Sequence, residues 1–303
     1  MTAEPWSVDV PDPVIDQVVD VDGTPMSGLV AHAADPRAVI VAIHGGATRA
    51  AYFDHPGHPD KSLLRLASSI GYTVVALDRP GYGSSRPFAD DMNPAARVDL
   101  AYGAIDRFLA GRPQGAGTFL LAHSAGCELA VRMAADRERG QGLLGLELSG
   151  TGLQHSTEAH EVLGDDERNA PGAGVRKLLW EPASLYPSEV IGGAMVASRT
   201  PPFEGSTVRA WPRETFRELA PAVTAPVHFT AAEFERVWRQ DDAALADIAA
   251  LFSGSSAVTV ERFAGGGHNL SIGHMARAYH LAVLSFIESC VARRVHPVPP
   301  PAS

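Results

Sequence analysis

Apolar residues along this chain fall into two alternating patterns, which predict a sheet whose strands are connected by helices. Continuous apolar runs at 38–46 and 118–124 are typical of strands that are buried on both faces of a sheet. Segments 61–71, 96–111 and 125–140 have the three-to-four-residue spacing of helices that bury one face. Strands and helices that alternate in this way predict an α/β fold, with a mainly parallel sheet flanked by helices.

Segments on either side of this region extend the sheet. Two short runs rich in β-branched residues, 14–21 and 26–33, are separated by a turn and predict an N-terminal hairpin. The remaining elements are expected as a strand and glycine-rich loop at 72–85, strands at 143–150, 226–233 and 257–265, and helices at 241–254 and about 271–294. Reactive groups in such sheets lie at the carboxyl ends of the strands, so the loops that follow strands are where chemistry is expected.

The alternation lapses between about residues 152 and 224, which predicts an insertion. Prolines and glycines there separate short helical pieces at 156–169, 174–180, 188–199 and 213–220. Large apolar side chains within it need a surface to pack against, so we expect a helical cap over the sheet rather than a linker. The expected organisation is a core at 1–151, a cap or lid at 152–224, the rest of the core at 225–295 and a flexible tail at 296–303.

Composition and charge narrow the class of protein. Of the 303 residues, 45% are hydrophobic, which allows a well-developed core, and the formal net charge is −10. Nucleic acid and anionic membranes are disfavoured as partners because both repel an acidic surface. We find no signal peptide and no run near the roughly 20 apolar residues that span a bilayer. We therefore expect a cytoplasmic protein. Cys127 and Cys290 are expected to be buried free thiols. The sequence favours no particular oligomeric state.

The segment 120–126, Leu-Leu-Ala-His-Ser-Ala-Gly, carries the strongest chemical signal. A buried strand precedes it and a helix follows, which places Ser124 at a sharp turn. Small residues two positions before and after the serine, Ala122 and Gly126, let the strand and the helix approach closely. Such a turn lifts the hydroxyl above the sheet and directs the amino end of the helix at the site, as a nucleophile requires. The alternative is a serine that only caps the helix.

This segment resembles the G-x-S-x-G nucleophile elbow of the α/β-hydrolase family, with Ala122 in place of the first glycine. The resemblance covers about residues 26–292 and implies an α/β-hydrolase fold with Ser124 as nucleophile. Haloalkane dehalogenases and epoxide hydrolases of this fold use an aspartate at the elbow, so the serine argues against both.

A second motif, Ile-His-Gly-Gly-Ala at 43–47, resembles the family's H-G-G oxyanion loop. The resemblance implies that the backbone N–H of Gly46, or alternatively of Ala47, joins that of Ala125 to hold an oxyanion. His44 is then structural, bonding within the loop. Residues 78–85 match the family's D-x-x-G-x-G-x-S loop, to which we also assign a structural role.

The expected base is His268, which follows a predicted strand and three glycines and precedes the last helix. A histidine base needs a loop position from which one nitrogen faces the serine and the other a carboxylate. The alternative is an exposed loop histidine. Two glutamates, Glu233 and Glu235, follow the preceding strand. In the family this strand often ends in G-x-x-D, and Ala232 and Glu235 occupy the matching positions, so Glu235 is the expected acid and Glu233 the alternative.

Other patterns point to no cofactor and no metal. Residues 54–60, Asp-His-Pro-Gly-His-Pro-Asp, could bind a metal ion, but the prolines and the lack of helical spacing favour a polar loop. No glycine-rich phosphate-binding motif is present.

The predicted function is a serine hydrolase that cleaves an ester or thioester of a hydrophobic small molecule through an acyl-enzyme. His123, Trp180 and Met195 are expected to contact the substrate. A thioesterase, an acyltransferase or a C–C bond hydrolase would use the same residues. The alternative of another class is a catalytically silent protein that keeps the fold and binds a ligand.

Overall fold

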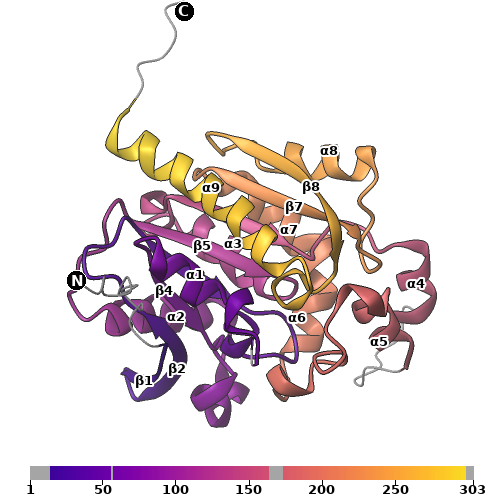
Figure 1. Ribbon diagram of the computed structural model, residues 1–303, viewed down its shortest axis with the longest axis horizontal. Coiled ribbons are helices and arrows are strands. Elements are labelled where there is room, and N and C mark those ends of the chain that lie inside the picture. The colour runs from indigo at the N-terminus through magenta and orange to yellow at the C-terminus, as the bar shows by residue number, and fades with distance from the viewer. Residues whose placement is uncertain (1–13, 56, 164–172, 298–303) are drawn as a thin grey trace, which may run out of the picture.

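An eight-stranded sheet runs through the centre of the protein in the order β1-β2-β4-β3-β5-β6-β7-β8 (Figure 1). The computed structural model describes residues 14–55, 57–163 and 173–297. The strands are β1 (Ile15–Val21), β2 (Thr24–Ala31), β3 (Val39–Ile43), β4 (Thr73–Leu77), β5 (Thr118–His123), β6 (Gly145–Ser149), β7 (Val227–Phe234) and β8 (Val258–Gly267). The first two strands form the predicted hairpin, and all pairings from β4 to β8 are parallel. The predicted α/β-hydrolase fold is therefore confirmed.

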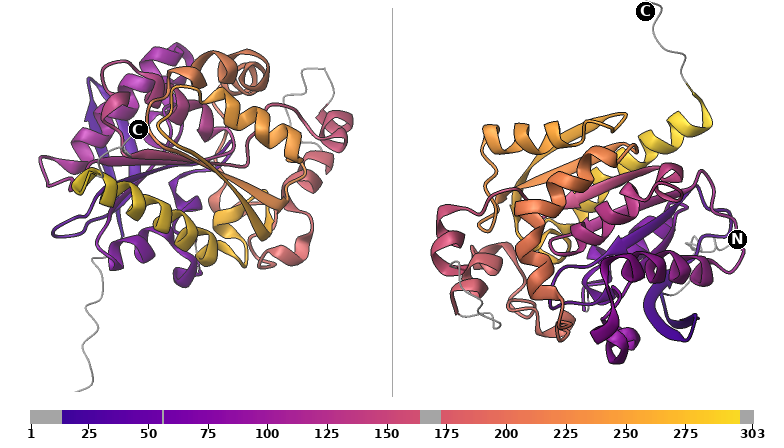
Figure 2. Two further views of the ribbon diagram at one scale, coloured as in Figure 1. Left: turned by 90° about the horizontal axis from the view of Figure 1, so that it is seen from above. Right: turned by 180° about the vertical axis from the view of Figure 1, so that it is seen from behind.

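Helices cover both faces of the sheet, as the left view of Figure 2 shows. One face carries α1 (Leu63–Ser69) and α9 (Ala276–Val295), whose apolar residues share a core cluster with Tyr52, Val74 and Phe119. The other carries α2 (Pro94–Leu109), α3 (Gly126–Ala135) and α8 (Asp242–Leu251). Strands such as β3 and β4 are buried along their whole length, which explains their uninterrupted apolar sequence.

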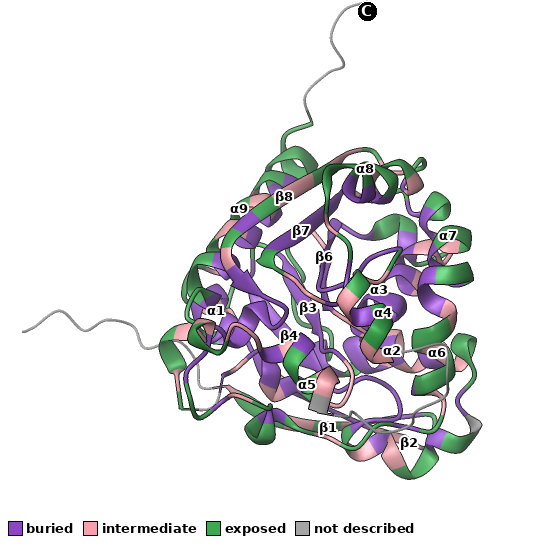
Figure 3. Cartoon of the chain, turned by 90° about the vertical axis from the view of Figure 1, so that its right-hand side faces the viewer, coloured by how far each residue is buried: buried purple, intermediate pink, exposed green. Residues whose placement is uncertain are grey.

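The described residues between β6 and β7 form four α-helices: α4 (Thr157–Leu163), α5 (Ala173–Trp180), α6 (Glu204–Ala210) and α7 (Phe216–Leu219). The helices α4 and α5 lie together at the right of Figure 1, with α6 nearer the centre, and Figure 3 shows exposed helical surfaces around the buried strands. Trp211, between α6 and α7, donates its indole N–H to Thr151 Oγ1 at 2.8 Å, just beyond the end of β6. This contact ties the segment to the end of the sheet where the parallel strands finish.

Two expectations for this segment need correction. The predicted helical piece at 188–199 is instead a series of turns with one short 3₁₀ helix, Ala194–Val196, because Gly192 and Gly193 adopt positive φ values of 88° and 72°. The helix α6 lacks a clear periodic signal and was not expected. Only 157–163 of the piece at 156–169 is described, and most of the expected tail at 296–303 lies outside the described residues.

Cys127 and Cys290 are both buried and free, as expected. In the described part of the chain, no helix combines the length and apolar character needed to cross a membrane.

Candidate active site

Ser124 lies at a sharp turn between β5 and α3. Its φ of 51° is left-handed, a strained conformation for a residue with a side chain. The Ser124 N–H donates to the Ser149 carbonyl at 2.8 Å, which fixes the turn to the neighbouring strand. Gly126 meets the predicted need for a small residue, because a Cβ there would lie 2.5 Å from the His44 carbonyl oxygen.

The imidazole of His268 bridges Ser124 and Glu235. Its Nε2 lies 3.3 Å from Ser124 Oγ, and its Nδ1 lies 2.8 Å from Glu235 Oε2. The ring and the carboxylate are 3% and 1% exposed, so solvent does not weaken their contact. Because the carboxylate accepts the Nδ1 proton, Nε2 is left to accept a proton from the serine. The Ser–His distance is at the long end for a hydrogen bond, as is common in unliganded sites.

The two candidate acids have different partners, although they are two residues apart. Glu235 comes directly after β7, where its N–H donates to the Ala232 carbonyl at 3.1 Å and turns the chain toward His268. Its Oε1 also accepts the Val237 N–H at 2.7 Å, which orients the carboxylate. Glu233 accepts the Gly265 N–H at 2.8 Å in an exposed position and makes no hydrogen bond to His268. The geometry therefore favours Glu235.

The loop after β3 passes over the start of α3. A Cβ on Gly45 would lie 3.1 Å from Ser124 Cβ, and one on Gly46 would lie 3.7 Å from Ala125 Cβ. Ala47 donates its N–H to Tyr82 Oη at 3.1 Å, so that amide is occupied. Among the described residues, the amides of Gly46 and Ala125 have no hydrogen-bond partner. These two amides, beside the amino end of a ten-residue helix, are suited to hold an anion.

The three expected substrate contacts lie in different environments. His123 is 3% exposed, stacks on Tyr52 at 4.8 Å between ring centroids and meets the edge of His268 at 5.0 Å. Burial, with a smaller contribution from His268, lowers the pKa of His123 well below its usual value, so the ring is neutral. Trp180 is buried against Tyr186, with ring centroids 5.2 Å apart. Met195 is 39% exposed.

Sequence reasoning did not single out three residues that surround the loop after β3: Arg79, Tyr82 and Glu204. Arg79 and Tyr82 lie in the D-x-x-G-x-G-x-S loop, where the pattern gave a structural role but no partner. Glu204 begins α6 and forms a buried ion pair with Arg79. Nothing in the local sequence marks it, because its role depends on a contact 125 residues away.

Asp54 and His58, in the segment considered as a possible metal site, instead make polar contacts with other side chains. Asp54 accepts a hydrogen bond from Ser62 Oγ at 2.6 Å, and His58 Nε2 lies 2.6 Å from Glu189 Oε1. In the part of the chain that the structure describes, no group of three or more histidine, cysteine, aspartate or glutamate side chains is arranged to hold a metal ion.

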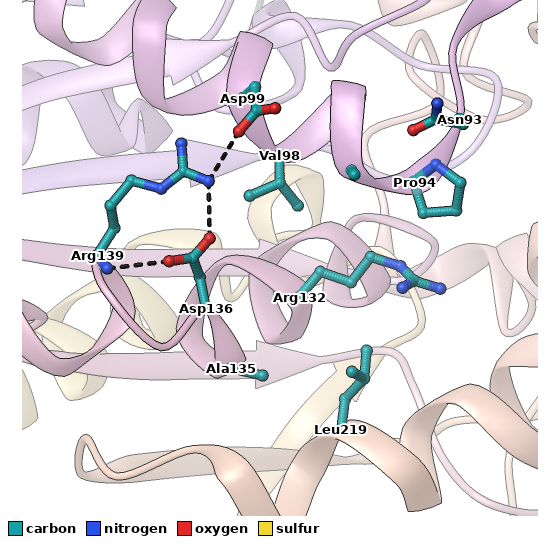
Figure 4. Close-up of a pocket in the computed structure, with 10 residues that line it drawn as sticks. Asn93, Pro94, Val98, Asp99, Arg132, Ala135, Asp136, Arg139 and Leu219 are labelled. Carbon is teal, nitrogen blue, oxygen red and sulfur yellow. Dashed lines mark hydrogen bonds and ion pairs between the residues drawn. The ribbon is translucent and has the colours of Figure 1, made fainter.

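A hollow of about 600 Å³ lies away from this site, between α2, α3 and Leu219 (Figure 4). Three of its charged side chains pair with one another: Arg139 Nη2 lies 2.8 Å from Asp99 and 2.7 Å from Asp136. Neither Ser124 nor His268 lines it, so the hollow is separate from the candidate active site.

Comparison with known proteins decides the family. The model of the alpha/beta hydrolase family matches residues 40–280, which is most of the chain. The chain belongs to the alpha/beta hydrolase family. Protein ABHD14A of Rattus norvegicus is 35% identical to this alpha/beta hydrolase over 69 residues. That match covers 23% of the chain and spans about a quarter, 26%, of the relative.

Solved structures share the fold of this alpha/beta hydrolase at low sequence identity. A thermostable carboxyl esterase from Bacillus coagulans is 15% identical, with a TM-score of 0.65 and coverage of 92% of this chain and 99% of the esterase. A soluble variant of monoglyceride lipase from Saccharomyces cerevisiae is 13% identical, with a TM-score of 0.67 and coverage of 96% and 99%. A thioesterase domain from the curacin biosynthetic pathway is 17% identical, with a TM-score of 0.57 and coverage of 91% and 100%.

Proposed function

We propose that this alpha/beta hydrolase is a serine hydrolase that cleaves a carboxylic ester or thioester of a hydrophobic small molecule. The observation that carries the proposal is the continuous hydrogen-bonded chain from Glu235 through His268 to Ser124. This order of groups lets the histidine take the proton of the serine hydroxyl while the carboxylate stabilises the imidazolium that forms.

In the proposed mechanism, Ser124 Oγ attacks the carbonyl carbon as His268 Nε2 accepts its proton. The amides of Gly46 and Ala125 hold the oxyanion of the tetrahedral intermediate. The carbon–oxygen or carbon–sulfur bond then breaks, and the imidazolium returns the proton to the leaving alkoxide or thiolate. Water activated by the same histidine attacks the acyl-enzyme and releases the acid.

The segment 152–224 is the proposed cap of the site. Its helices lie at the end of the sheet where Ser124 emerges, and it carries Trp180 and other buried apolar side chains. Such a cover suits a hydrophobic acyl or alcohol group. We also propose a cytoplasmic location, in keeping with two buried, unpaired cysteines.

Turnover on a series of acyl esters and acyl thioesters, with wild type and Ser124→Ala, tests the proposal. We expect wild type to hydrolyse members of the series and to be labelled by a fluorophosphonate at Ser124 alone. The alanine variant should lose labelling and fall in turnover by several orders of magnitude, since the triad acts as a unit. Equal turnover in the two proteins would rule out the mechanism.

Acyl transfer and carbon–carbon bond hydrolysis would use the same residues as ester or thioester hydrolysis. Because the residues do not distinguish these reactions, their products must be analysed. Acyl transfer would give a new ester when an alcohol is supplied as acceptor, or an amide when an amine is supplied. Absence of labelling and of turnover in folded wild type would support the ligand-binding alternative instead.

A further inference from the structure

A buried ion pair joins the segment at 152–224 to the core beside the loop after β3. Arg79 Nη2 and Nη1 lie 2.8 Å and 3.3 Å from Glu204 Oε1 and Oε2, and the two side chains are 2% and 7% exposed. Tyr82 donates its hydroxyl proton to Glu204 Oε1 at 3.0 Å. Burial opposes the charge of Arg79, but the Glu204 carboxylate outweighs it and raises the pKa of the guanidinium above its usual value. The guanidinium is therefore charged.

The same guanidinium holds a peptide group of the oxyanion loop. Arg79 Nη2 donates to the Gly45 carbonyl at 3.0 Å, and Thr48 Oγ1 donates to that oxygen at 3.1 Å. The His44 ring contributes a third contact, with Nδ1 2.8 Å from the Gly45 oxygen. The Arg79 N–H donates to His44 Nε2 at 3.1 Å, which makes Nδ1 the protonated nitrogen.

The direction of the Gly45 carbonyl sets the direction of the Gly46 amide. In a trans peptide the C=O and the following N–H point opposite ways. Donors that draw the Gly45 oxygen toward Arg79 therefore turn the Gly46 N–H away from Arg79. Glycine on both sides of this peptide makes a flip sterically easy, since neither residue has a Cβ to resist it. After a flip, a carbonyl oxygen would replace the N–H donor.

We propose that Glu204 is a positioning residue for the oxyanion loop: by fixing Arg79 on the Gly45 carbonyl, it keeps the Gly46 N–H directed at the site. The inference rests on the proposed function, because it concerns the donor assigned there to the oxyanion. It also makes assembly of that donor depend on docking of α6, which supplies the carboxylate.

Without a neighbouring positive group, the negative charge of Glu204 would destabilise an oxyanion at this site. A Cβ on Gly46 would lie only 3.0 Å from Glu204 Oε1, so the carboxylate is next to the loop. Arg79 and Tyr82 both bind that oxygen and offset its charge. The ion pair can therefore hold the loop without imposing a net negative charge on the reacting oxygen.

The test replaces the ion pair by apolar side chains in the double variant R79M/E204L. Removing both charges avoids the cost of one unpaired buried charge, so the protein should stay folded. We expect kcat to fall about ten- to a hundredfold, since misplacing one oxyanion donor has effects of this order, with KM changed less than about threefold. The inhibition constant of a trifluoromethyl ketone, which forms an oxyanion adduct with the serine, should rise by the same factor as kcat/KM falls.

A second buried ion pair provides the matched control. Arg97 and Glu128 are 3% and 2% exposed and 2.9 Å apart, and neither contacts the loop after β3. Glu128 also pairs with the partly exposed Arg132, and Arg97 lies over the Phe203 ring, an apolar contact that methionine can keep. The control variant R97M/E128L should keep kcat and the inhibition constant close to wild type. Arg79→Lys is the second test variant, because a lysine keeps the positive charge but cannot bridge Glu204 and Gly45 as the forked guanidinium does. It should show the same split between kcat and KM.

Two outcomes separate the inference from the proposed function. If wild type neither hydrolyses substrate nor is labelled at Ser124, the proposed function fails. If wild type does both, and folded R79M/E204L and Arg79→Lys retain its kcat and inhibition constant, the positioning role of Glu204 is overturned. An equal loss in R97M/E128L would likewise overturn it, since the effect would then follow from losing any buried ion pair.

Discussion

The carboxylate of Glu235, just after β7, lies 2.8 Å from Nδ1 of His268, whereas Glu233, on β7, accepts the backbone N–H of Gly265 on β8. Replacing Glu235 by glutamine keeps its size but removes its charge. In a serine–histidine–aspartate triad the equivalent change lowers turnover about ten-thousand-fold. We expect a loss approaching that size for Glu235→Gln and less than about tenfold for Glu233→Gln. Steady-state kcat of the two variants measures the difference, and the reverse ranking would transfer the role to Glu233.

Stability should decline in acid because of buried neutral histidines. Burial lowers the pKa of His280 to about 3, compared with ~6.5 when unfolded. Between these values the unfolded chain binds a proton that the folded chain does not, so the free energy of unfolding falls by about 1.4 kcal/mol per pH unit as pH decreases. By pH 5 the contribution is about 2 kcal/mol.

His280→Leu removes this contribution. Urea unfolding at pH 7 and pH 5 should show a smaller loss of stability for this variant than for wild type, by about 2 kcal/mol. The exposed His296 provides the control, and His296→Gln should follow the wild-type dependence. The same loss in His280→Leu as in wild type would contradict the expected protonation difference.

Trp180 and Met195 should respond differently to truncation. Trp180 is buried against Tyr186, so Trp180→Ala should lower the free energy of unfolding by about 3–5 kcal/mol. Met195 is exposed and lies three residues before Ser198, whose N–H donates to the Ala47 carbonyl in the loop after β3. Met195→Ala should therefore leave stability within about 0.5 kcal/mol while altering relative kcat/KM across acyl-chain lengths. Unchanged selectivity would mean that Met195 lies outside the path of the acyl chain.

Gly126→Ala should disrupt the turn at Ser124, since its Cβ would lie 2.5 Å from the His44 carbonyl oxygen and 2.6 Å from that of Ile43. Neither neighbour is a flexible side-chain end, so the backbone must move. We expect a stability loss of more than about 2 kcal/mol with weaker fluorophosphonate labelling. Gly142→Ala is the control because a Cβ there meets nothing within 4 Å. Denaturant unfolding and labelling rates measure both effects, and similar behaviour of the two variants would contradict the steric argument.

The parts of this protein that follow from local sequence were predictable. Apolar runs located the strands, and the small residues around Ser124 located the turn, because both depend on neighbours in sequence. The helix predicted at 188–199 was wrong because the adjacent residues Gly192 and Gly193 interrupt the apolar residues there and adopt positive φ values that form turns. The spacing of apolar residues does not show whether a glycine pair continues a helix or forms a turn.

In the candidate site, too, some residues could be predicted from the sequence and others could not. Ser124, His268 and Glu235 each follow a strand, so their meeting could be expected from the order of elements in a parallel sheet. The contacts of Glu204 with Arg79 and Tyr82 depend on how the inserted segment packs, which no local pattern specifies. Long-range ion pairs of this kind become visible only once the tertiary structure is known.

The last helix has a consequence for the order in which a newly made chain acquires its chemistry. The hydroxyl of Tyr279, on α9, hydrogen-bonds to Glu147 and Ser149 of β6, the strand that holds the Ser124 amide. His268 also lies only eight residues before α9 begins. During synthesis, the turn at Ser124 leaves the ribosome long before the imidazole and this supporting tyrosine. A nascent polypeptide therefore carries Ser124 without its proposed base until residues 268–279 have been synthesised, so any reaction through the proposed triad must wait for that later part of the chain to fold.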